Sequence, residues 1–300
     1  MNINDNWLSV LSTTFIKDQQ DYADLNIYAI ADAAQDKYFL KSLVHLRQKC
    51  LLTEAAGDKA REVSPHLLQL PVDFSASEWT WIEKHIAGTP KMTILTSSLP
   101  FELLYEHLRQ FLEVKFEGGL EMILAFWDPA ILACLVGHKE DATLYISDPV
   151  LDAAQKETLL RPVKRWWYWD RQGNLQVITG TNENLSLLPA FHSSLFFTVE
   201  QEELMIEATF PDNLSYYLRL NNGFLVDKFT DQELYDLIIN SLPAARSYGL
   251  TGTRDILNFM CLQLIYKENF DTNPQLQHAL AQVKDKILSM DDAMLQLSNQ

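Results

Sequence analysis

The sequence predicts an α/β chain of the α+β kind, with an N-terminal mixed β-sheet domain and flanking helices followed by a C-terminal all-helical lobe. Two observations predict this class. Short β-like runs alternate with helical patterns in the first half, and only helical patterns occur after about Phe191. We therefore expect a sheet domain over residues 1–150, a β-hairpin connecting segment over 151–190 and a helical lobe over 191–300.

Three short apolar runs predict strands in the first domain, at residues 26–34, 65–72 and 91–98. The stretches 36–49 and 75–88 lie between these runs and have helical patterns. A strongly amphipathic helix is expected over residues 100–112, where apolar side chains share one stripe.

Two β-hairpins are also expected. Gly118-Gly119 lies between two β-like runs within residues 113–128, and Gln172-Gly173-Asn174 supplies the turn of a second hairpin within residues 161–180. The first hairpin implies a mixed rather than a purely parallel sheet.

Capping patterns place the helices of the C-terminal lobe. Thr198 is followed three residues later by Gln201, and Thr230 by Glu233, which is the spacing of a capping box. Asn273 precedes Pro274, which favours a helix that begins at this proline.

Charge and cysteine content exclude several classes of partner and location. The 300 residues carry a net charge of −16, which repels phosphate backbones and anionic lipid, so we expect no nucleic acid and no membrane partner. The same charge suits a basic protein partner. The three cysteines have no metal or redox spacing and indicate reduced, buried thiols. No secretory signal or membrane span is expected, which favours a cytoplasmic protein.

The familiar catalytic and cofactor motifs are missing from the sequence. It has no glycine-rich nucleotide fingerprint and no G-x-S-x-G nucleophile elbow. The histidines never pair at metal-ligand spacing, and Cys134 with His138 is the closest approach. We expect no cofactor and no metal.

Two carboxylates need separate consideration, because Asp32 and Asp128 each follow an apolar run. At one edge of a sheet they could hold a metal and support a metal-assisted hydrolase. The sequence "DPAIL" also fits a simpler role, in which Asp128 caps a helix that begins at Pro129. The second Asp-Pro pair, at Asp148, favours capping.

The stretch "RWWYWD" holds Trp166, Trp167 and Trp169. Adjacent residues of a strand face opposite ways, so a role in one core is hard to give to all three. The alternatives are a purely core role and a partner-binding surface, since aromatic side chains are favoured at protein interfaces.

Several stretches, taken in order, resemble one known family. They are "YAIADAAQD", "SPHLLQL", "HLRQFLEV", "MILAFWDPAILACL" and "YGLTGTRDILNFMCLQLIYKENFDTNP". The chain resembles the effector chaperone, or adaptor, family of the type VI secretion system over about residues 27–297, with a core of about 27–150. The residues that carry the resemblance are Asp32, Pro65, Asp128, Pro129, Gly249, Phe270 and Asp271.

The resemblance implies a cytosolic binding protein rather than an enzyme. Members of the family bind a cognate toxin effector and promote its loading onto the secretion spike, through the valine–glycine repeat protein (VgrG) or its tip protein. The chain departs from the family at Ala125 and Ala130, where arginines are usual. An immunity protein that neutralises a toxin is a further alternative, although immunity proteins are usually smaller.

Overall fold

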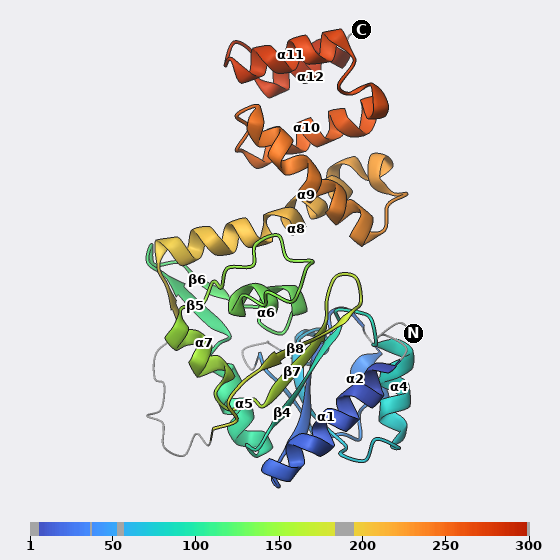
Figure 1. Ribbon diagram of the computed structural model, residues 1–300, viewed down its shortest axis with the longest axis vertical. Helices are drawn as coiled ribbons and strands as arrows, with labels where there is room; N and C mark the ends of the chain where they lie inside the picture. Colours follow the sequence, from blue (N-terminus) through green and yellow to red (C-terminus); the bar gives the residue numbers. More distant parts are fainter. Residues whose placement is uncertain (1–5, 37, 53–56, 184–194, 299–300) are drawn as a thin grey trace. The chain divides into compact units, whose positions relative to one another are not determined.

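The computed structural model describes residues 6–36, 38–52, 57–183 and 195–298 (Figure 1). The chain divides into two compact units, Met1–Ala208 and Thr209–Gln300, and each is described by itself. The predicted domain limits at residues 150 and 190 stay predictions, and the expected start of the helical lobe at Phe191 lies outside the described residues.

The first unit is built around a six-stranded sheet with the strand order β2-β3-β1-β4-β7-β8. Its strands are β1 (Asn26–Asp32), β2 (Gln48–Cys50), β3 (Pro65–Leu70), β4 (Met92–Ser97), β7 (Arg165–Trp169) and β8 (Leu175–Thr179). Every neighbouring pair in this sheet is antiparallel. The predicted fold class is therefore confirmed, with the larger sheet antiparallel throughout.

A separate three-stranded sheet mixes strand directions, and its parallel strand lies after Phe191, where only helical structure is expected from the sequence. Its strands are β5 (Glu113–Phe116), β6 (Glu121–Ile123) and β9 (Leu195–Phe197), in the order β6-β5-β9. The β5–β6 pair is the expected hairpin, and Gly119 has the positive φ of 85° that its turn requires. Strand β9 pairs parallel to β5.

Helices cover both faces of the six-stranded sheet (Figure 1). The helices that precede β7 are α1 (Trp7–Asp21), α2 (Phe39–Ser42), α3 (Asp58–Arg61), α4 (Ser77–His85), α5 (Phe101–Arg109), α6 (Pro129–Val136) and α7 (Ala153–Leu160). Helices α1, α2 and α4 pack in one core, which we call the α1-side core. Helices α5, α6 and α7 pack in the other, the α5-side core. Because both faces are covered, the central strands β1, β4 and β7 are buried on both sides.

Strand β7 shows this two-sided burial most clearly. Trp166 and Tyr168 lie in the α5-side core, whereas Trp167 and Trp169 lie in the α1-side core. At the start of the strand, the Arg165 guanidinium donates to both carboxylate oxygens of Asp18 on α1, with N···O distances of 2.7 and 3.2 Å. At its end, Oδ1 of the buried Asp170 accepts from the N–H groups of Gln172 and Asn174, which shapes the predicted turn.

Two local predictions are wrong. The helix expected over residues 36–49 is only α2, because the chain turns after Ser42 and then forms strand β2. The pair Asp148-Pro149 does not begin a helix, since α7 is capped by Asp152 instead. Pro149 lies against Gly137, where a Cβ atom would come within 2.6 Å of the proline nitrogen.

The second unit is helical. Its helices are the later part of α8 (Val199–Val226), then α9 (Asp231–Ser247), α10 (Thr253–Tyr266), α11 (Pro274–Lys284) and α12 (Met290–Ser298). The predicted capping boxes of Thr198 and Thr230 are both present, and Asn273 caps α11 as expected. Each of the last four helices buries one apolar stripe, as Leu234, Ile238 and Leu242 do on α9.

Candidate partner-binding site

Asp128 is the N-cap of α6. Its Oδ1 accepts hydrogen bonds from the N–H groups of Ala130 at 2.9 Å and Ile131 at 3.1 Å, and Pro129 occupies the first helical position. The capping interpretation of Asp128 is therefore confirmed. Helix α6 then ends at Gly137, which is left-handed with φ of 62°.

Asp32 also has a structural role, because its carboxylate stabilises the turn at the end of β1. Its Oδ1 accepts from the N–H of Ala34 at 3.0 Å, and its Oδ2 from the side chain of Gln35 at 3.1 Å. Within the parts of the chain that the structure describes, no group of three or more His, Cys, Asp or Glu residues could hold a metal ion. Asp32 and Asp128 therefore give no support to a metal-assisted hydrolase.

The remaining residues of the resemblance also occupy structural positions. Pro65 begins β3 directly opposite Asp32 in the strand pairing. Gly249 has a φ of 77° in the turn between α9 and α10, and the Phe270 ring packs edge-on against Phe259 at 5.3 Å. Asp271 is exposed.

The two alanines that depart from the family pattern lie on either side of Asp128. Ala125 is half-buried against the α5-side core, and its carbonyl accepts from the N–H of Asp128 at 2.9 Å. Ala130, also half-buried, lies in the first turn of α6.

The predicted partner-binding surface of Trp166, Trp167 and Trp169 is wrong. These side chains are only 0%, 2% and 1% exposed, respectively. The reason is the two-sided cover of the sheet, which gives each face of β7 its own core, so opposite-facing tryptophans are all buried. A partner has no access to them in the folded chain.

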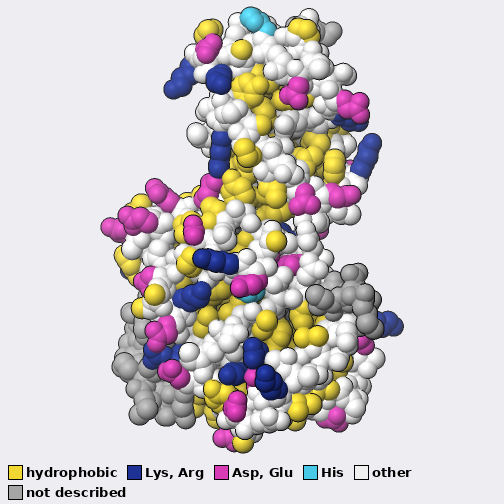
Figure 2. Space-filling view, viewed as in Figure 1, with side chains coloured by type: hydrophobic (Ala, Val, Ile, Leu, Met, Phe, Trp, Pro, Cys, Tyr) yellow, Lys and Arg dark blue, Asp and Glu magenta, His cyan; other side chains and the backbone are white. Residues whose placement is uncertain are grey.

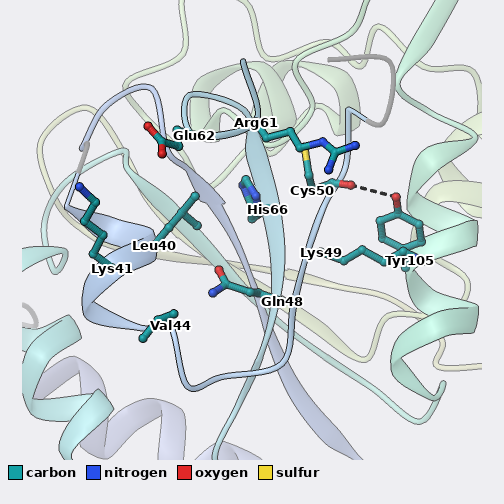
Figure 3. A pocket seen from close by; sticks show the side chains of 10 residues that line it. All are labelled: Leu40, Lys41, Val44, Gln48, Lys49, Cys50, Arg61, Glu62, His66 and Tyr105. Carbon is teal, nitrogen blue, oxygen red and sulfur yellow. Dashed lines mark hydrogen bonds between the residues drawn. The ribbon is translucent and has the colours of Figure 1, made fainter. Parts of the chain in front are cut away.

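The structure instead places a cavity of about 590 Å³ along the edge strand β2 (Figure 3). It is lined by Leu40, Lys41, Val44, Gln48, Lys49, Cys50, Arg61, Glu62, His66 and Tyr105. Leu40 and Lys41 come from α2, which packs in the α1-side core, while Tyr105 comes from α5 on the opposite face. The cavity therefore extends around the edge of the sheet from one face to the other.

The pairing of β2 with β3 fixes which main-chain groups point into this space. The N–H of Leu51 donates to the carbonyl of Pro65, and the N–H of Gln69 donates to the carbonyl of Arg47, both at 2.9 Å. In an antiparallel pair these bonded positions alternate with positions whose N–H and C=O groups point outward. Gln48 and Cys50 are thus the outward residues of β2.

One outward group is already occupied. The hydroxyl of Tyr105 donates to the carbonyl of Cys50 at 2.9 Å, as Figure 3 shows. Burial raises the pKa of Tyr105, so the hydroxyl keeps its proton. Among the described residues, Gln48 Oε1 is buried without a hydrogen-bond partner. The Gln48 side chain and its main-chain groups therefore retain hydrogen-bonding capacity at the cavity.

The charge of the cavity is opposite to that of the whole chain. Lys41, Lys49 and Arg61 line it against a single carboxylate, Glu62, whereas the chain carries a net charge of −16. Acidic and basic side chains are elsewhere scattered over the face shown in Figure 2. Burial lowers the pKa of His66, so its imidazole is neutral at neutral pH and adds no charge.

Lys49 is held in place by two neighbours. Its Nζ lies 2.9 Å from Glu102 Oε2 and 3.8 Å from the centre of the Tyr105 ring. The hydrogen bond with Glu102 raises the pKa of Lys49, and the bonds from Lys49 and Arg47 lower the pKa of Glu102. Lys41 and Arg61 are exposed, and no described carboxylate forms an ion pair with either.

The spacing of residues 36–49 predicts a single helix, so the sequence does not reveal strand β2, along which the cavity lies. One signal was present: the "KCLL" stretch is apolar and lies just before a segment with no clear pattern. Nothing in the sequence, however, places Cys50 opposite His66, because that pairing is made across a chain reversal. Of the three cysteines, Cys134 and Cys261 are buried as predicted, whereas Cys50 is only half-buried.

The comparisons with known proteins give one family match. Residues 27–144 match the model of the Domain of unknown function (DUF4123), a stretch shorter than half of the chain. It contains β1 to β6, the β2 cavity and the Asp128 cap. No curated protein and no solved structure matches the chain. None of the described helices combines the length and hydropathy needed to cross a membrane.

Proposed function

We propose that the protein is an adaptor that binds a cognate toxin effector of a type VI secretion system and promotes its loading onto the secretion spike. The observation that carries the proposal is the match of residues 27–144 to a domain family linked to type VI effector adaptors. The resemblance of the ordered stretches beyond residue 144, including Gly249 and Phe270, supports the same assignment.

The geometry supports a binding role. The carboxylates that a metal-assisted hydrolase would require have structural roles instead. Asp32 stabilises the turn after β1, and Asp128 caps helix α6. The β2 cavity is a place on the sheet where main-chain groups, cationic side chains and the apolar Leu40 and Val44 meet. Such a mixture suits a polypeptide segment, because main-chain groups give affinity and neighbouring side chains give specificity.

The acidic surface contributes to the encounter. A net charge of −16 favours association with a partner of basic net charge and raises the rate of that association. We expect binding to weaken as salt is raised, because screening shortens the range of the attraction.

The test is co-expression of the tagged chain with the products of neighbouring genes, followed by affinity purification. We expect one large effector to co-purify and its cellular level to fall when this chain is deleted. Recovery of VgrG or its tip protein in the same complex would support the loading step. If no effector or spike component is recovered and the toxin is secreted normally without this chain, the proposal is wrong.

A control separates the adaptor from an immunity protein. The toxic domain of the recovered effector is expressed alone, with and without this chain. An adaptor leaves the toxicity of that domain unchanged and promotes secretion, whereas an immunity protein abolishes the toxicity and leaves secretion unchanged.

A further inference from the structure

We propose that the outward edge of β2 binds an extended acidic segment of a partner protein, which joins the six-stranded sheet as an additional strand. The identification of that partner as an effector rests on the proposed function, but strand addition does not. The proposal depends on three features of the site: its main-chain groups, its charge and its shape.

The main-chain groups are those of a sheet edge that can accept a strand. Strand β2 is the last strand on its side of the sheet, and the N–H and C=O of Gln48 and the N–H of Cys50 point away from β3. Among the described residues, the carbonyl of Cys50 accepts from the Tyr105 hydroxyl, and the Cys50 thiol donates to the carbonyl of Leu52 at 3.2 Å. Unpaired edge groups are a template for a further strand.

The charge of the site selects an acidic segment. Two exposed cations, Lys41 and Arg61, border the cavity and are free of ion pairs with any described residue. A strand laid along β2 would direct alternate side chains toward the side of α2 and toward the side of α5. Carboxylates on the α2 side would be near Lys41, in a chain whose overall charge repels acidic partners elsewhere.

The shape of the site favours a segment of extended chain. The cavity includes Leu40 and Val44 on one face of the sheet and Tyr105 on the other, so it follows the strand edge around both sides. Val44 is 69% exposed and offers an apolar contact. The unpartnered Oε1 of Gln48 adds an acceptor for a main-chain or side-chain N–H.

The probe is a library of random peptides, displayed on phage and selected on the full-length chain. A length of about 12 residues is long enough to contain a strand of usual length. A recovered peptide is labelled with fluorescein, and its Kd is measured by fluorescence anisotropy. We expect the recovered peptides to be rich in Asp and Glu and to lack a central proline. Recovery of no peptide, or of peptides without net negative charge, would overturn the proposal.

Main-chain recognition is tested with Gln48→Pro and its matched control Gln48→Ala. The proline removes the outward N–H and leaves the bonds to β3, which is why proline is tolerated on edge strands. We expect Gln48→Pro to weaken binding about tenfold, the equivalent of a hydrogen-bond pair, and Gln48→Ala to weaken it far less. Equal binding by all three proteins would contradict strand addition.

Two further measurements keep the test decisive if Gln48→Pro does not fold. The double variant Lys41→Glu with Arg61→Glu changes only exposed side chains, and we expect it to weaken binding by about tenfold or more at low salt. Amide hydrogen exchange of Gln48 and Cys50 in the wild-type chain should slow when the peptide is bound. Unchanged exchange at both amides would place the peptide elsewhere, and full displacement by inorganic phosphate would identify a simple anion site.

The outcome can be separated from that of the proposed function. If Gln48→Pro still co-purifies the effector while peptide binding is lost, the adaptor proposal stands and the effector docks elsewhere, which overturns this inference for the effector. If peptides bind at β2 and no effector is recovered with either protein, strand addition stands without the adaptor role.

Discussion

The two edge strands of the six-stranded sheet differ in what lies against them. On β8, burial lowers the pKa of His138 in the segment that follows α6, and the backbone of Val177 is among the nearby groups that oppose this shift. The same imidazole lies 2.7 Å from the hydroxyl of Tyr168 through its Nδ1, and that hydroxyl donates to Asp141 at 3.0 Å. On β2, the Tyr105 hydroxyl donates to the carbonyl of Cys50, and a cavity with cationic side chains lies along the rest of the edge.

The difference shows two ways in which this chain limits unwanted strand pairing at the edges of its sheet. An open edge invites unwanted pairing, and native proteins cover it or place charges beside it. At the β8 edge, which we call the closed edge, His138 lies beside Val177 and is tied to an interior pair in which Tyr168 is fully buried and Asp141 nearly so. The β2 edge instead has Lys41, Lys49 and Arg61 beside it. These cations disfavour non-specific strand pairing and leave the edge accessible to an acidic strand.

The strand beside the closed edge should be the most sensitive to truncation. We expect Trp166→Ala and Trp167→Ala each to lower the free energy of unfolding by about 3–5 kcal/mol, because each removes a large side chain from a different core. Urea unfolding measures the loss. Val177→Ala, at an exposed position on β8, is the control and should cost far less. Losses below about 1 kcal/mol at both tryptophans would mean that they are not core residues.

The helix that covers part of the β2 edge should loosen in acid. Burial lowers the pKa of His107 on α5 to about 4, from an ordinary value of 6.5. The folded state therefore binds fewer protons than the unfolded state, and stability rises with pH across this interval. We expect a loss of about 3 kcal/mol as the pH falls from 6.5 to 4.

The contribution of His107 is isolated by comparison with His107→Gln, which keeps an N–H donor for the carbonyl of Leu159. Free energies of unfolding are measured for both proteins between pH 7 and pH 4, a range that covers both the folded and unfolded pKa. The wild-type curve should fall more steeply. Parallel curves would show that His107 titrates normally in the folded chain.

A further loss of stability is expected from a change at Gly137, the residue that precedes His138. We expect Gly137→Ala to cost about 2–3 kcal/mol, because φ is 62° and the new Cβ would lie 2.6 Å from the nitrogen of Pro149. Gly119→Ala is the matched control, with φ of 85° and no atom within 4 Å of the new Cβ. Thermal unfolding compares the two, and equal losses would remove the role given to the Pro149 contact.

A smaller effect is expected at the start of the helix that leads to this closed edge. Asp128→Ala should lower stability by about 1 kcal/mol, the usual cost of a lost N-cap, and Asp128→Asn should cost only a few tenths because asparagine is also a good cap. Chemical denaturation measures both variants. A large loss for Asp128→Asn, or the loss of a hydrolytic activity, would favour a role beyond capping.

The smallest effect is expected at the partly covered β2 edge. Tyr105→Phe removes the hydrogen bond to the Cys50 carbonyl and keeps the ring beside Lys49, so we expect a loss of about 0.5–1 kcal/mol. Urea unfolding measures the stability, and peptide binding at β2 should persist in this variant. A loss of that binding would show that the Tyr105 hydroxyl contacts the peptide.

The sequence predicts much of this fold because local patterns agree with the tertiary structure. Strand β1 follows its apolar run, both hairpins turn at their glycines, and the capping boxes of Thr198 and Thr230 form as spaced. These features depend on residues a few positions apart. The Asp128 cap is also a local feature, because it consists of one side chain and the amides two and three residues later.

The candidate site could not be predicted, because it depends on contacts between distant segments. Phe39, Leu40, Leu43 and Leu46 have helical spacing, yet pairing with β3 makes a strand of the residues that follow. The burial of all three tryptophans could not be predicted for a related reason: alternation along a strand does not tell whether the second face is covered. That cover comes from helices elsewhere in the chain.

The aromatic character of β7 has a consequence for folding. A strand with one polar face is protected against slippage, because a shift by one residue would bury its polar side chains. In β7 the central residues on both faces are bulky aromatics, so such a shift would exchange one buried ring for another. The distinction between native and shifted pairings then depends on the ends of the strand, where Arg165 meets the buried Asp18 and Asp170 holds its turn. By this argument Asp18 and Asp170, and not the tryptophans, favour the native alignment of this aromatic strand.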